Sequence, residues 1–121
     1  MNSPTLATLN ATFKRLHNFG HLASIASWDQ AAMMPAKGNE ARAAAMAELQ
    51  VLMHQTLTDP SLKALFAEAA AADLPDADKA SLVEMQREWA LVNRLPQDLV
   101  EAQSLASARC EHAWRTQRKA N

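Results

Sequence analysis

Apolar residues recur at every third or fourth position along most of the chain, a spacing typical of helices packed on one side. The first such run covers about residues 4–33, where Ser3 can cap the helix and Pro4 suits its first position. At 1.5 Å per residue this helix would be about 40 Å long, longer than its expected partners. Gly20 inside it costs roughly 1 kcal/mol relative to Ala, so we expect another helix to approach there. The stripe of this helix is Leu6, Leu9, Phe13, Leu16, Gly20 and Ala23.

A second helix should follow after a short turn. Pro35 disfavours helical geometry at Met34, which ends the first helix. Asn39 is a good cap for the next helix, and Glu40 suits the positive field of its first turn. The stripe of this second helix is Met46, Leu49, Met53 and Leu57. The chain should therefore open with a long helical hairpin.

Three more helices are expected, each introduced by a proline. Asp59 should cap a third helix that starts at Pro60, Pro75 opens a fourth, and Pro96 precedes a fifth that runs to Asn121. Their stripes are Leu62, Leu65, Phe66 and Ala69; Leu82, Met85, Trp89 and Val92; and Leu99, Ala102, Ala106, Cys110, Ala113 and Trp114. We predict an all-α fold, an antiparallel bundle of about five helices that forms one domain over residues 1–121.

Composition supports helices and narrows the partners. Only two Gly and five Pro occur, and the net charge of −1 provides no overall field for nucleic acid or an anionic membrane. The single Cys110 excludes an internal disulfide. Residues 1–6 do not look like a signal peptide, and no apolar run is long enough to span a bilayer. We therefore expect a cytoplasmic protein without nucleic-acid or membrane partners.

Few residues suggest chemistry. His17 and His21 have the spacing of a zinc-binding pair, and Asp29 lies near the same face as a possible third ligand. However, Asn18 stands where a metalloprotease helix would carry its catalytic Glu, and this histidine spacing is common by chance. We expect no metal or catalytic site here. Cys110 fits a small buried hydrophobe, and the methionines at 46, 53 and 85 fit core positions.

The most distinctive stretch is Trp28–Pro35. Asp29 lies in the last turn of its helix, where the dipole disfavours an anion. It should therefore have a partner, either Arg42 or the free N–H groups that start the next helix, and so tie the two helix ends together. Trp28 should anchor the helix pair. A carboxylate that faces substrate is the alternative for Asp29. The predicted structural motif is Trp28, Asp29, Met34, Pro35 and Arg42.

This stretch also resembles a known family. Trp28-Asp29-Gln30, then Met34-Pro35-Ala36-Lys37-Gly38, then Ala41-Arg42 is similar to the N-terminal region of the Taq-type thermostable metallocarboxypeptidases. The similarity continues through Leu49, His54, Asp59-Pro60, residues 95–100, Ala113-Trp114 and Arg118, with Gln117 departing from the usual Ala. It spans essentially the whole chain.

The resemblance implies a large, almost wholly helical enzyme that uses zinc (or cobalt) to remove C-terminal amino acids from peptides. Family members are usually cytoplasmic homodimers with a deep groove, and their metal and catalytic residues lie far beyond residue 121. It therefore implies that this chain is a non-catalytic N-terminal part that walls the groove, with the remainder of the enzyme as its partner and no metal of its own. The alternatives are a free-standing helical interaction module and a small helical metal-binding protein.

Overall fold

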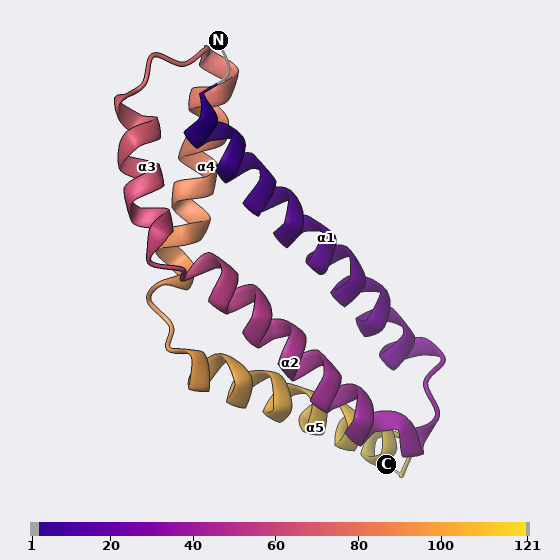
Figure 1. Cartoon of the computed structure of the whole chain (residues 1–121). Helices are drawn as coiled ribbons and strands as arrows, with labels where there is room; N and C mark the ends of the chain where they lie inside the picture. Colours follow the sequence, from indigo (N-terminus) through magenta and orange to yellow (C-terminus); the bar gives the residue numbers. More distant parts are fainter. Residues whose placement is uncertain (1–2, 121) are drawn as a thin grey trace.

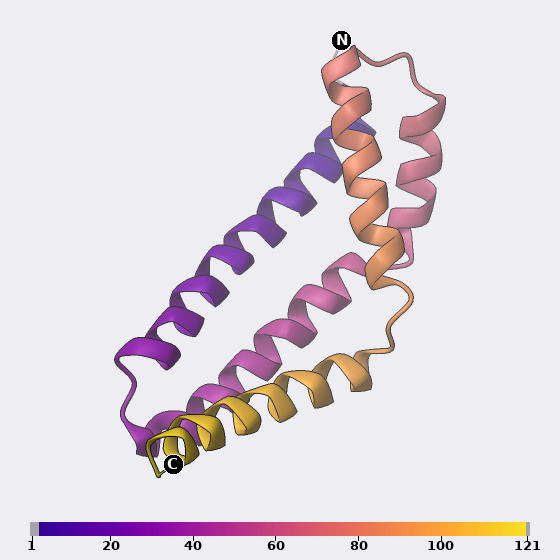
Figure 2. The same cartoon turned by 180° about the vertical axis from the view of Figure 1, so that it is seen from behind.

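The computed structural model describes residues 3–120, and these residues form helices joined by short turns (Figures 1 and 2). No strand occurs among them, which confirms the all-α prediction. The helices are α1 (Pro4–Ala32), the short 3-10 helix η1 (Ala36–Gly38), α2 (Asn39–Leu57), α3 (Ser61–Ala71), α4 (Asp76–Val92) and α5 (Gln97–Ala120). The chain opens with the expected hairpin of α1 and α2.

The apolar core lies at one end of the molecule, where the first half of α1 and the end of α2 meet α3 and α4 (Figure 1). Leu9 is fully buried there. The ring of Phe66 lies 6.3 Å from that of Phe13 and 5.2 Å from that of Trp89, so the aromatic residues join three helices. The predicted stripes of α1 to α4 supply all of this core except Leu74, which lies between α3 and α4. The core consists of Leu6, Leu9, Leu16, Leu57, Leu62, Phe66, Ala69, Leu74 and Leu82.

At the other end α2 and α5 run side by side in opposite directions (Figures 1 and 2). The buried residues between them are small, namely Ala43 and Ala47 of α2 and Ala108 of α5. Small side chains let two helices approach closely, so this contact needs few large apolar groups.

The predicted inward stripe of α5 is wrong. Leu99 and Trp114 are 50% and 55% exposed, and Cys110 is exposed rather than a buried hydrophobe. α5 turns its Ala108 side to α2, and the predicted stripe lies on the opposite side of the helix. Close approach between small residues decided the packing face, and the larger apolar residues were left outside.

Three local predictions also need correction. Adding a Cβ to Gly20 would meet no atom within 4 Å, so no helix approaches there. Asn39 does not cap α2, because η1 leads directly into α2 and the Asn39 side chain instead accepts a hydrogen bond from Gln30. α3 begins at Ser61, one residue later than expected.

Asp59 precedes the N-cap of α3, which is Pro60, but its carboxylate still bonds the first residue of the helix. Asp59 Oδ1 accepts hydrogen bonds from the Ser61 N–H at 2.9 Å and from Ser61 Oγ at 2.7 Å. These two bonds hold the pKa of the Asp59 carboxyl below its ordinary value of 3.8. At the start of α1, Ser3 Oγ accepts from the Leu6 N–H at 3.4 Å, as the sequence predicted.

The expectations for the chain ends fall partly beyond this structure. Met1, Asn2 and Asn121 lie outside the described residues. The expectation that the chain has no signal peptide and the expectation that the last helix runs to Asn121 therefore stay predictions. Among the helices of residues 3–120, none is both long enough and apolar enough to cross a membrane.

Candidate functional site

The turn after α1 is held by backbone hydrogen bonds. The Asp29 carbonyl accepts from the N–H groups of Met33 at 2.9 Å and Met34 at 2.8 Å, which closes the helix before Pro35. Gly38 then lies against Met34, since a Cβ at Gly38 would come within 3.2 Å of Met34 Cγ. The spacing of Met34 and Gly38 in the sequence thus has a steric reason, because a larger residue would displace the Met34 side chain.

Arg42 joins the two ends of the hairpin. Its Nη2 donates to Asp29 Oδ2 at 2.7 Å, and its Nη1 donates to the Ala26 carbonyl at 2.9 Å. The side chains of Arg42 and Asp29 are 27% and 35% exposed. The guanidinium therefore neutralises Asp29 and also places positive charge at the carboxyl end of α1, where the helix dipole favours it. Arg42 was the partner that the sequence indicated for Asp29.

Gln30 and Arg115 make further contacts at this end of the molecule, and neither was assigned a structural role from the sequence. Gln30 is buried, and its Nε2 donates to Asn39 Oδ1 at 3.3 Å. The Gln30 carbonyl accepts a hydrogen bond from Arg115 of α5, which also pairs with Glu111. Gln30 could have been found from its place beside Asp29. Arg115 gave no signal, because 85 residues separate it from its acceptor.

Trp28 does not anchor the helix pair. Its side chain is 63% exposed and lies outside the contact between α1 and α2. Met34 is half-buried in the turn, and Pro35 is exposed. Within the predicted motif, Asp29 and Arg42 therefore have a structural role, and so does Met34 through its contact with Gly38. Trp28 is exposed and has no structural role within the described part of this chain.

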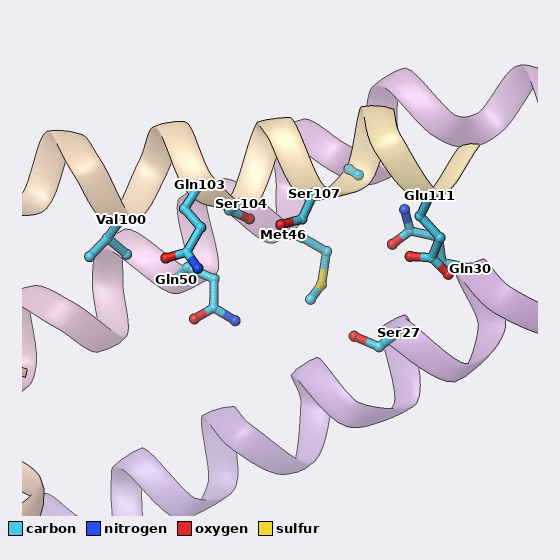
Figure 3. A pocket seen from close by; sticks show the side chains of 10 residues that line it. Ser27, Gln30, Met46, Gln50, Val100, Gln103, Ser104, Ser107 and Glu111 are labelled. Atoms are coloured by element: carbon cyan, nitrogen blue, oxygen red, sulfur yellow. The ribbon is translucent and has the colours of Figure 1, made fainter. Parts of the chain in front are cut away.

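A trough runs between α1 and the pair formed by α2 and α5. Its first part is a cavity of about 340 Å³ beside the hairpin turn, lined mainly by amides and hydroxyls (Figure 3). Its second part, of about 700 Å³, extends to the apolar core and has a more apolar lining. Both parts are lined by Gln50 of α2 and by Val100 and Gln103 of α5, so they adjoin one another. We refer to these two adjoining cavities as the trough.

The histidine candidates do not assemble a metal site in residues 3–120. His17 lines the second part of the trough together with the buried His54, whereas Asp29 is engaged by Arg42. No group of three potential His, Cys, Asp or Glu ligands occurs among the described residues. The hypothesis of a small metal-binding protein requires the side chains of His17, His21 and Asp29 to converge on one point, and in this structure they do not.

The three methionines predicted to lie in the core do not all lie there. Met53 and Met85 pack against the apolar core as predicted, but Met46 lines the first part of the trough. There it lies among Ser27, Gln50 and Gln103 (Figure 3). Amides and hydroxyls donate and accept hydrogen bonds without titrating near neutral pH. The lining also includes the carboxylate of Glu111, which pairs with Arg115, and as a whole it is suited to binding polar groups through hydrogen bonds.

Comparison with known proteins gives a consistent family. The model of the carboxypeptidase Taq (M32) metallopeptidases matches residues 8–121. Thermostable carboxypeptidase 1 of Thermus thermophilus is 34% identical over 100 residues, which cover 76% of this chain and 20% of that protein. Thermostable carboxypeptidase 1 of Pyrococcus furiosus is 25% identical over 111 residues, covering 91% and 22%.

A solved structure shows the same helical arrangement. Metallocarboxypeptidase 1 of Trypanosoma cruzi superposes with a TM-score of 0.77 and 44% sequence identity, over 84% of this chain and 21% of that one. The chain thus spans about a fifth of the length of the relatives it matches.

Proposed function

Since this chain belongs to the carboxypeptidase Taq (M32) family of metallopeptidases, we propose that it forms the N-terminal helical region of a carboxypeptidase that releases C-terminal amino acids from peptides. The proposal rests on the family match over residues 8–121, together with the observation that the chain spans only about a fifth of the length of its relatives. Residues 1–121 would form one helical domain of that larger protein.

The chemistry would come from elsewhere in the enzyme. A zinc or cobalt ion of the parent enzyme would activate the water that attacks the terminal peptide bond. The residues described here do not fit such an ion, because no three potential ligands converge among them. The 121 residues alone should therefore neither hydrolyse peptides nor bind a stoichiometric metal ion.

The part left to this chain is to position the peptide. The trough is open to one side and lined by Gln50 and Gln103, whose amides can pair with the N–H and C=O groups of a peptide. We assign to it one wall of the substrate groove. A cytoplasmic location and a homodimeric enzyme are parts of the same proposal, drawn from the resemblance.

The decisive experiment uses the protein encoded by the whole reading frame that contains these residues. We expect it to release the C-terminal residue of a short peptide, to lose this activity with a chelator, and to leave the amidated peptide intact. The isolated 121-residue chain should do none of this. A whole protein that is folded but inactive on peptides with free C-termini would contradict the proposal.

The wall of the groove is tested by Gln103→Ala in the same whole protein. Loss of a group that contacts the peptide in both ground and transition states raises KM and leaves kcat largely unchanged. The matched control is Gln117→Ala, an exposed glutamine on the same helix, away from the trough. Equal KM values for both variants would remove Gln103 from the groove.

A free-standing interaction module is the second candidate, and one observation favours it. The outward stripe of α5 keeps Leu99 and Trp114 about half exposed, as a partner-binding helix would. A reading frame that encodes no residues beyond those shown would favour this candidate over the first.

A further inference from the structure

The second half of α1 carries apolar residues on two sides. One side holds Leu16 and Ala23, which are buried toward the other helices. The other side holds Leu22, Ile25 and Trp28, which are 58%, 53% and 63% exposed. Residues three apart on a helix lie next to one another on its surface, so these three side chains form a continuous strip. We call them the outer strip.

No described element covers the outer strip. Figures 1 and 2 show that α1 forms a long edge of the molecule, with the other helices on its inner side. Single exposed apolar residues are normal on a protein surface, but a contiguous group marks a place where another surface binds. An uncovered Trp beside an uncovered Ile is the kind of anchor that binding surfaces use.

The outer strip is also held in a fixed position. Toward the amino end, α1 is fixed by the apolar core through Leu9 and Leu16. Toward the carboxyl end, Arg42 binds Asp29 and the Ala26 carbonyl, and Arg115 binds the Gln30 carbonyl. A surface fixed at both ends loses little conformational entropy when a partner binds, which favours binding.

We propose that the outer strip is the seat on which the later, catalytic part of the same polypeptide packs. This inference rests on the proposed function, since it requires the longer enzyme. The matched structure holds these helices in 21% of its chain. The rest of such a chain must pack on faces that this fifth leaves open. Among those faces the outer strip offers a Trp and two branched aliphatic residues together, whereas the two large apolar residues of the outward stripe of α5, Leu99 and Trp114, stand far apart with only alanines and Cys110 of that stripe between them.

A second copy of the chain fits the outer strip less well. Stable interfaces between separate proteins bury about 1,200–2,000 Å² in total, far more than three side chains supply. A segment of the same polypeptide has a high effective concentration and needs no such area. Covalent continuity therefore favours the same chain as the occupant.

Cysteine labelling tests the proposal directly. Cys110 is exposed and is first replaced by Ser. In that background Ile25→Cys reports on the outer strip, and Val83→Cys, on the exposed side of α4, is the matched control. Maleimide modification is followed at each position by peptide mass spectrometry, once in the isolated chain and once in the protein from the whole reading frame.

In the isolated chain both positions should react at similar rates. In the whole protein Ile25→Cys should react at least about tenfold more slowly, because labelling then waits for the packed surface to open, while Val83→Cys keeps its rate. Leu22→Cys should repeat the result if Ile25→Cys impairs folding. Unchanged labelling of the outer strip in the whole protein would overturn the proposal, and so would equal protection of Val83→Cys.

Two further measurements separate the occupants and the two proposals. Protection at Ile25→Cys that appears in the isolated chain and rises with its concentration would identify a second copy, and would overturn the inference. Peptidase activity of the wild-type whole protein is measured independently. An inactive whole protein with a protected outer strip would sink the proposed function alone, and an active one with a freely labelled strip would sink this inference alone.

Discussion

The two ends of this molecule are stabilised in different ways. At one end, α3 and α4 close an apolar core over the first half of α1, with Phe66 between Phe13 and Trp89. At the other end, α1 is held by directed polar contacts from Arg42 and Arg115. The trough extends along the inner side of α1 from the apolar core to the hairpin turn, and the outer strip lies on the other side of α1, toward the polar end. The difference gives the proposed role of the outer strip a physical reason: with the remainder of the polypeptide packed there, the length of α1 would serve two neighbours.

The largest expected effect is at the apolar end. Phe66→Ala removes a ring that is 3% exposed and packed against two others, so it should destabilise the chain by about 3–5 kcal/mol, measured by urea unfolding. The control, Leu22→Ala in the outer strip, should change stability by no more than about 0.5 kcal/mol in the isolated chain. Similar losses for both variants would erase the contrast between the two ends.

The polar end should respond more weakly. Asp29→Ala loses the Arg42 pair and should cost about 1 kcal/mol, which lowers the melting temperature by about 4–8 °C. Arg42→Ala should cost at least as much, because it also removes the bond to the Ala26 carbonyl. An unchanged melting temperature for Asp29→Ala would mean that Asp29 does not tie the helix ends together, and would favour a role toward substrate.

Gly20→Ala, in contrast to the preceding variants, should stabilise the chain. A methyl group there meets no atom within 4 Å, so the variant should keep the fold and gain up to about 1 kcal/mol from helix propensity. Thermal unfolding of the isolated chain measures the gain. A lower melting temperature would show that the middle of α1 packs more closely than the structure indicates.

The smallest expected effect is a pH-dependent change in melting temperature at Asp59. The hydrogen bonds from Ser61 depress the pKa of Asp59 in the folded chain, so they stabilise it above the unfolded pKa, and this stabilisation is lost as the pH falls through the folded value. Asp59→Ala should therefore lie slightly below wild type in melting temperature at neutral pH and approach it as the pH falls below the ordinary pKa of 3.8. A difference that is the same at neutral and at acid pH would exclude this linkage.

Periodicity predicted the helices well because local rules decide them. Prolines at 35, 60, 75 and 96 mark the breaks, and a helix (η1, α3, α4 and α5) begins one residue after each of them. The inward faces of α3 and α4 also followed, since each has one apolar stripe that packs into the shared core. α5 did not follow, because its packing face was chosen by a small residue, Ala108, and not by its largest apolar ones.

The candidate site was predictable only where charge gave a reason. Asp29 at a helix carboxyl end requires a cation, and Arg42 was the nearest across the turn. Nothing local indicated that Arg115 would reach Gln30, or that Trp28 would be exposed. Both depend on how helices distant in sequence are placed, and for Trp28 on what they leave uncovered.

The contact between Arg115 and Gln30 also has a consequence for synthesis on the ribosome. The chain emerges from its amino end, so α1 is complete long before the residue that fastens its far end, 85 positions later, has been translated. The apolar end needs nothing after α4 and can close first. During that interval the carboxyl half of α1 is held only by its hairpin with α2. The nascent chain is then least constrained at the place where, on our proposal, the remaining polypeptide would later pack.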